Sequence, residues 1–177
     1  MKHRRTFWPA LVLGMALWVA VLPAGMALAQ QIPAPGKEVR GEFLWMKTVR
    51  GEFERVVENV KAAAAVKNFP TNNVRDYEKT FGERIRQLGG GTMPFRHYRI
   101  IEFCNVMLAM RTLSEDLRMG VFMPCRMVVF AREENGPVTL VTVNPHFMVA
   151  VMENPALKPM AAEVEAVIET IFELVED

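Results

Sequence analysis

The two cysteines of the chain, Cys104 and Cys125, are the residues best suited to chemistry. A thiol pair can form a disulfide, hold a soft metal ion or accept sulfur. We expect a strand–helix–strand crossover between them, which would place them level on neighbouring parallel strands about 5 Å apart, within disulfide reach. The pair is therefore the candidate site. The alternative is that both residues are structural, either as packed small hydrophobes or as a disulfide.

Other side chains near the cysteines extend the candidate site. Glu102 shares a strand face with Cys104 and could act as a base or tune the thiol, or it could simply pair with Arg99 or Arg126. The candidate binding residues are Cys104, Cys125, Asn105, Glu102, Arg126 and His97. The candidate metal ligands are Cys104, Cys125 and Met123.

The sequence assigns no cofactor and no reaction. A soft metal, haem or a sulfur species each suits a cysteine pair, although core packing accounts for most of the 13 methionines. Covalent haem attachment needs Cys-x-x-Cys-His and a closed zinc site needs four spaced ligands, and neither pattern occurs. Serine-hydrolase and zinc-protease motifs are absent, and Ser114 is the only serine. Whether the protein is an enzyme stays undecided, and a non-enzyme is favoured.

The first residues have the pattern of an export signal. A basic start, an apolar run and Ala27-Leu28-Ala29 predict a signal peptide over residues 1–29 that is cleaved before Gln30. Arg4-Arg5 leaves the twin-arginine route open beside the general secretory route. The mature protein is then periplasmic or secreted, and it meets the membrane only through the uncut signal peptide.

The remaining chain fits one domain. Residues 30–41 are rich in proline and glycine and predict a flexible leader. A single domain over residues 42–177 follows, because this length buries a core without disulfides. The formal net charge of +1 gives no reason to expect nucleic acid as a partner, whereas a small ligand, a metal ion or a second copy of the chain remain candidates.

Hydrophobic periodicity predicts an α+β fold with the order β-α-(short α)-β-α-β-β-α. Helices should pack on one face of a mostly antiparallel sheet. The strongest local pattern is a hairpin on Asn135-Gly136. The predicted strands are 42–49, 98–104, 120–131 and 138–143. The predicted helices are 52–67, 74–88, 106–113 and a last one from Asn154-Pro155, and residues 146–151 are predicted to form a short helix or a turn.

Two segments of the central stretch resemble a known family. Ile100 to Asn105 ends in Cys-Asn, and Val121 to Val129 contains Met-Pro-Cys before an acidic-Gly turn. This pattern resembles the prokaryotic domain-of-unknown-function family 302 over residues 42–177. The resemblance implies a small α+β fold similar to one copy of the TATA-box-binding-protein architecture, and it implies no activity. His97 and His146 depart from the family pattern.

Two functions from different classes follow. The first is an exported binding or carrier domain whose site is built on Cys104 and Cys125. The second is a non-catalytic interaction module that dimerises or docks on an envelope partner through its sheet, with both cysteines structural.

Overall fold

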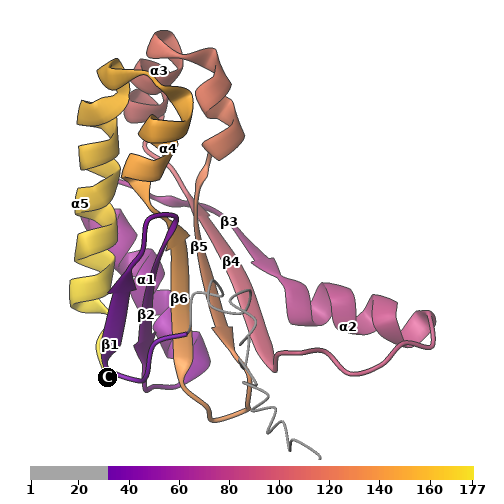
Figure 1. The fold of residues 1–177 in the computed structure, drawn as a ribbon. Helices are drawn as coiled ribbons and strands as arrows, with labels where there is room; N and C mark the ends of the chain where they lie inside the picture. Colours follow the sequence, from indigo (N-terminus) through magenta and orange to yellow (C-terminus); the bar gives the residue numbers. More distant parts are fainter. Residues whose placement is uncertain (1–31) are drawn as a thin grey trace, which may run out of the picture.

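The computed structural model describes residues 32–177 and contains one six-stranded, antiparallel sheet (Figure 1). The strand order is β1-β2-β6-β5-β4-β3. The strands are β1 (Lys37–Arg40), β2 (Leu44–Val49), β3 (Thr71–Asp76), β4 (His97–Phe103), β5 (Cys125–Ala131) and β6 (Val138–Val143). The predicted α+β class, with helices on one face of an antiparallel sheet, is confirmed.

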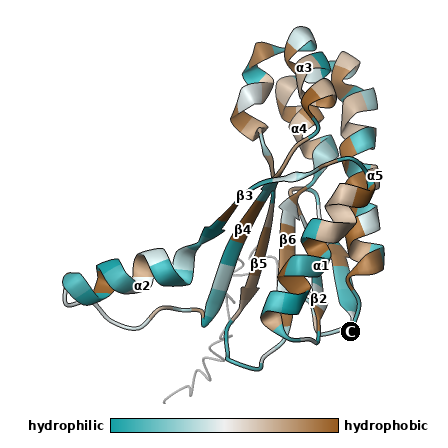
Figure 2. Ribbon diagram, turned by 180° about the vertical axis from the view of Figure 1, so that it is seen from behind, coloured by the Kyte–Doolittle hydropathy of each residue, from teal (hydrophilic) through white to brown (hydrophobic). Residues whose placement is uncertain are grey.

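Two long helices, α1 (Phe53–Val66) and α5 (Lys158–Leu174), cover one face of the sheet (Figure 2). Helix α1 begins at Glu52, whose side chain accepts hydrogen bonds from the N–H groups of Glu54 and Arg55. Its apolar residues recur at helical spacing, so one side of the helix is buried and the other is charged. The core therefore lies between these helices and the sheet.

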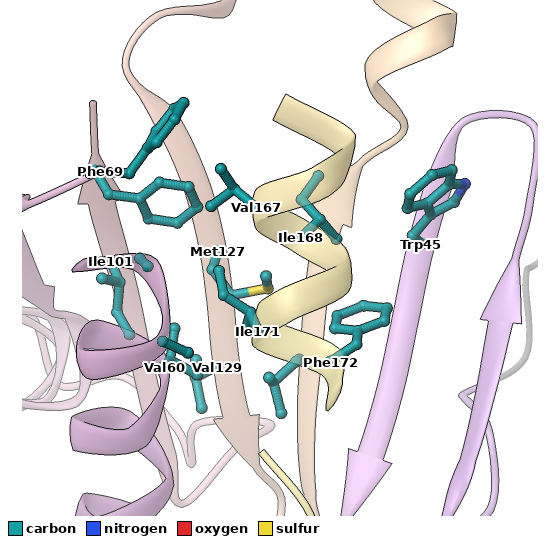
Figure 3. Packing of buried hydrophobic residues seen from close by; sticks show 14 of the residues in the cluster. Trp45, Val60, Phe69, Ile101, Met127, Val129, Val167, Ile168, Ile171 and Phe172 are labelled. Atoms are coloured by element: carbon teal, nitrogen blue, oxygen red, sulfur yellow. The ribbon is translucent and has the colours of Figure 1, made fainter. Parts of the chain in front are cut away.

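Helix α5 supplies the centre of that core. Val167 and Ile171 lie on the side of α5 near Met127 of β5, and Ile168 lies toward Trp45 of β2 (Figure 3). Ile168 is only 1% exposed. The last helix therefore packs its apolar side on the sheet, as the sequence predicts.

The other face of the sheet, here called the open face, carries no helix among residues 32–177. Strand alternation places Tyr98, Ile100, Val128, Phe130 and Val141 on it, opposite to the buried residues of the same strands. All five are partly buried by their neighbours. The first described residues, 32–35, lie beside its lower end.

A group of short helices, here called the cap, lies beyond one end of the sheet (Figure 1). It consists of α3 (Val106–Glu115), η1 (Leu117–Phe122), α4 (Pro145–Met152) and η2 (Pro155–Leu157). Asn105 begins α3 by accepting a hydrogen bond from the N–H of Leu108 at 3.0 Å, as its position in the sequence predicts. The cap covers the end of the core at the first turns of α5.

The cap also corrects the predicted crossover. Strands β4 and β5 are antiparallel, with Phe103 opposite Cys125. Residues 105–124 fold into α3 and η1 at the end of the sheet and do not cross its face, so the chain re-enters the sheet at the end where it left. The parallel, level placement of the two cysteines was therefore wrong.

Three further elements differ from expectation. Residues 37–40 of the predicted flexible leader form β1 and pair with β2. Polar residues 71–76 form the edge strand β3, where one side needs no apolar residues. Helix α2 (Tyr77–Gln87) follows directly. The predicted strand over 120–131 begins only at Cys125, because η1 takes its first residues.

The predicted signal peptide, residues 1–29, lies outside the described residues. Within residues 32–177, no helix combines the length and the apolar character needed to cross a membrane.

Candidate functional site

A cavity of about 50 Å³ lies under the cap, at the end of the sheet from which β4 leaves and β5 returns. Strand ends, cap helices and the first turns of α5 all contribute side chains to it. The lining residues are Phe69, Cys104, Asn105, Leu108, Ala109, Thr112, Met119, Phe122, Met123, Cys125, Pro145, Met148, Val149, Leu157, Met160, Ala161 and Val164. The lining therefore combines apolar carbon with two thiols and four thioethers.

The polar side chains of the lining are already satisfied by the protein. Asn105 donates through Nδ2 to the carbonyl of Asn68 at 3.1 Å, while its Oδ1 caps α3. Thr112 donates through Oγ1 to the carbonyl of Leu108 at 2.8 Å. A bound water needs two to four polar partners. The cavity offers none that are free, so we expect it to be dry.

The two thiols in the lining are held in their neutral form. Burial raises the pKa of the Cys125 thiol to about 12, and the neighbouring Cys104 adds to the effect. Burial also raises the pKa of the Cys104 thiol. The thiolate is the nucleophilic form. Both side chains are therefore weakly polar and unreactive at neutral pH.

The cysteines do not form the predicted bridge. Both are free thiols, and they are not within disulfide distance of each other. Cys125 lies directly opposite Phe103, whereas Cys104 is the next residue along, beyond the end of β4. In an antiparallel pair this offset separates the two side chains, although both reach the same cavity.

Four of the predicted site residues meet at the cavity: Cys104, Cys125, Asn105 and Met123. Glu102 and Arg126 lie opposite each other in the sheet, and Arg126 lines a second cavity that shares Cys125 with the first. His97 begins β4, seven residues before Cys104. At about 3.3 Å per residue it lies roughly 20 Å away from the cavity. Glu102, Arg126 and His97 do not line the cavity under the cap.

Glu102 is held by cations and not by a thiol. Its Oε1 lies 3.3 Å from Nε of Arg126 and 3.4 Å from Nε of Arg75, and Asn73 donates to Oε2 at 3.2 Å. Burial alone would raise the pKa of the Glu102 carboxyl, but the hydrogen bonds and the two arginines together lower it. The carboxylate is therefore ionised and paired, which was the alternative reading of this residue.

His97 belongs to a charged cluster at the other end of β4. Its ring stacks on Phe53 with centroids 4.7 Å apart, and its Nδ1 lies 3.1 Å from Glu78. Beside it, the guanidinium of Arg99 contacts Glu54 at 2.8 Å and also Asp76 and Glu78. This cluster joins α1, β3 and α2 to the sheet, so its role is structural.

The sequence did not reveal most of the lining. Phe122 was hidden inside the predicted strand, Met119 lies just before it, and Met160 has the spacing of a core residue on the last helix. The available signal was a second apolar run, residues 145–152, between the hairpin and that helix. It is apolar on all sides, and such a helix must be covered.

Comparisons with known proteins agree with this fold. A family model described as "Domain of unknown function DUF302" matches residues 45–175. A crystal structure of an uncharacterized conserved DUF302 protein from Bacillus stearothermophilus is similar, with a TM-score of 0.64 and 25% sequence identity. That similarity covers 77% of this chain and 100% of the other. Among curated proteins, the search found no match.

Proposed function

The chain belongs to the DUF302 family, and for this member we propose a binding function in which the domain holds a small, uncharged, apolar ligand in the cavity under the cap. One observation carries the proposal. The lining has no ionised side chain, and its amide and hydroxyl groups are bonded within the protein. An ion or a strongly polar molecule would lose its hydration there without compensation, whereas an apolar molecule would not.

The raised pKa values of the two thiols favour a binding function over a reaction at sulfur. A reactive cysteine needs a lowered pKa, and both cysteines here have a raised one. We also propose, from the signal-like start of the sequence, that the domain works outside the cytoplasm. Burial in the neutral form would protect the thiols from oxidation in that compartment.

Filling the cavity should abolish binding without unfolding the protein. Ala109 is partly buried on α3 and lines the cavity, so Ala109→Leu puts three more carbon atoms into or beside the space. Xenon is an uncharged probe that enters dry apolar cavities. We expect the wild type to shift the ¹²⁹Xe NMR signal in proportion to protein concentration, and Ala109→Leu to reduce that dependence at least about fivefold, as the loss of about 1 kcal/mol of contact would.

The matched control is Ala162→Leu, the same change at an exposed position of α5 outside the lining. Ala162→Leu should shift the ¹²⁹Xe NMR signal as strongly as the wild type does. A wild-type protein that leaves the xenon signal unchanged, or an Ala109→Leu protein that shifts it equally, would overturn the proposal.

The sulfur content of the lining favours a second candidate, a soft metal ion such as Cu(I). Two thiols and the thioethers of Met119, Met123, Met148 and Met160 reach one cavity. Thiolates and thioethers are the ligands that Cu(I) prefers. Such an ion would bind thiol sulfur together with methionine thioethers.

Metal binding would be distinguished by its pH dependence. A thiol ligand must lose its proton, so raised thiol pKa values make the apparent Cu(I) affinity fall about tenfold per pH unit on acidification. Competition with a Cu(I) chelator at several pH values measures this, with Cys104→Ser expected to remove it. Met107→Leu, at a residue that is 73% exposed on α3, is the control. Affinity that is independent of pH, or that equals the wild-type value in both Cys104→Ser and Cys125→Ser, would rule out this candidate.

A further inference from the structure

Helix α2 has an apolar side but no core to pack on. Tyr77, Phe81, Ile85 and Leu88 recur at steps of three and four residues, here called the α2 stripe. No residue of the helix is buried, and Phe81 and Leu88 are 43% and 68% exposed. Figure 1 shows the helix projecting from the sheet edge like an arm. A helix of this length is marginal in water unless one side packs.

The α2 stripe runs without interruption onto the open face of the sheet. Tyr77 contacts Phe81 with ring centroids 4.5 Å apart and Tyr98 at 5.7 Å. Tyr98 in turn stacks on Phe130 of β5 at 6.1 Å. Beyond these rings lie Val128 and Val141, which face each other across β5 and β6. The arm and the sheet therefore form a single, L-shaped apolar surface.

The length of α2 matches the width of the open face. At 1.5 Å per residue, α2 is about 16 Å long. Strands lie about 4.8 Å apart, so the helix spans about three of them, the width of β4, β5 and β6. A second copy of this chain supplies both an arm of that length and a sheet of that width. A two-fold axis brings each arm onto the other sheet and makes the L-shaped surface self-complementary.

We propose that the protein forms a two-fold dimer in which α2 of each subunit lies across the open face of the other. The two arm-on-sheet contacts cover on the order of 600 Å² in projection, counting both sides of each. This is about half of the 1,200 Å² at which stable, specific interfaces begin, so the dimer belongs with weak, transient complexes. The dimer should therefore dissociate measurably on dilution.

The test changes one residue of α2 and one residue of the open face. Phe81→Glu places a charge in the α2 stripe, at a residue exposed enough to tolerate it. Val141→Lys places the opposite charge on the open face. By sedimentation equilibrium on the full chain recovered after export, we expect each variant to raise the dimer dissociation constant about a hundredfold or more, because the two-fold repeats the change in both contacts.

Mixing the two variants tests the exchange of arms itself. The mixed dimer keeps one unaltered arm-on-sheet contact, and its other contact pairs Glu with Lys, so mixing should restore dimers that neither variant forms alone. Gln87→Glu, which adds one negative charge to the exposed side of α2 away from the α2 stripe, should dimerise as the wild type does. Far-ultraviolet circular dichroism checks folding, and Val143→Lys on the same face replaces Val141→Lys if the latter unfolds.

Three results would overturn the proposal. A wild-type chain that stays monomeric at all concentrations means that α2 and the open face do not bring two copies together. Dimers that survive Phe81→Glu but not Val141→Lys mean that two sheets meet without the arms. Failure of the mixture to dimerise means that α2 of one subunit does not contact the open face of the other.

Discussion

Replacing Ile168 by Asp should unfold most of the protein. Ile168 is 1% exposed and lies on the side of α5 that faces the sheet, toward Trp45 of β2 (Figure 3). A carboxylate at that position would lose its hydration among apolar side chains and would leave a void beside it. The expected loss is above about 4 kcal/mol, a large part of the 5–15 kcal/mol that typically stabilises a domain. Urea denaturation at neutral pH measures it.

The control for Ile168→Asp is Ala166→Asp, two residues earlier on the exposed side of the same helix. It introduces the same residue without burial, so it should cost less than about 1 kcal/mol, mostly through helix propensity. Equal losses at the two positions would mean that the side of α5 facing the sheet has been misassigned.

Replacing Arg99 by Met should be the second most damaging change. The side chain of Arg99 is 10% exposed, and its guanidinium contacts three carboxylates, those of Glu54, Asp76 and Glu78. Removing the cation leaves these carboxylates repelling one another on α1, β3 and α2. Because some of them reach solvent, the expected loss at neutral pH is about 3 kcal/mol, the lower end for a broken buried ion pair. Arg96→Met breaks an exposed pair with Glu134 and should cost at most about 0.5 kcal/mol.

Acidification should reduce the difference in unfolding free energy between the wild type and Arg99→Met. Burial alone would raise the pKa of Glu78, but hydrogen bonds with Arg99 and His97 lower it. A lowered pKa in the folded state stabilises the protein above the unfolded value, about 4.3, and this stability is lost as pH falls through the folded value. The variant has less of this stability to lose. A gap in unfolding free energy that widens below about pH 4 would contradict the role given to Glu78.

The sequence predicted best those parts of the fold that local patterns determine. The hairpin on Asn135-Gly136, the cap at Asn105 and the apolar face of the last helix each depend on residues close together in the chain, and all three are present. The edge strand β3 was missed because its residues are polar, and a strand at an edge is not required to alternate. The direction of β5 was missed because it depends on where residues 105–124 fold, and no local pattern encodes that.

The candidate site was found in part, and for an incorrect reason. Cys104 and Cys125 do meet one cavity, but through antiparallel strand ends and not through a parallel pair. His97 was included because it lies in the same stretch of sequence, although a strand of seven residues separates its two ends by about 20 Å. Apart from Met123, the methionines of the lining could not be predicted, since core packing and cavity lining use the same residue type.

The most direct test of the proposed binding site is ¹³C-methyl NMR of methionine under xenon. Met119, Met123, Met148 and Met160 line the cavity, whereas Met107 and Met110 are 73% and 57% exposed on the outside of α3. We expect xenon to shift the four lining methyl signals together, with one saturation curve, and to leave those of Met107 and Met110 in place. Shifts confined to the two exposed methionines, or no saturable shift at any of the four, would contradict a ligand site under the cap.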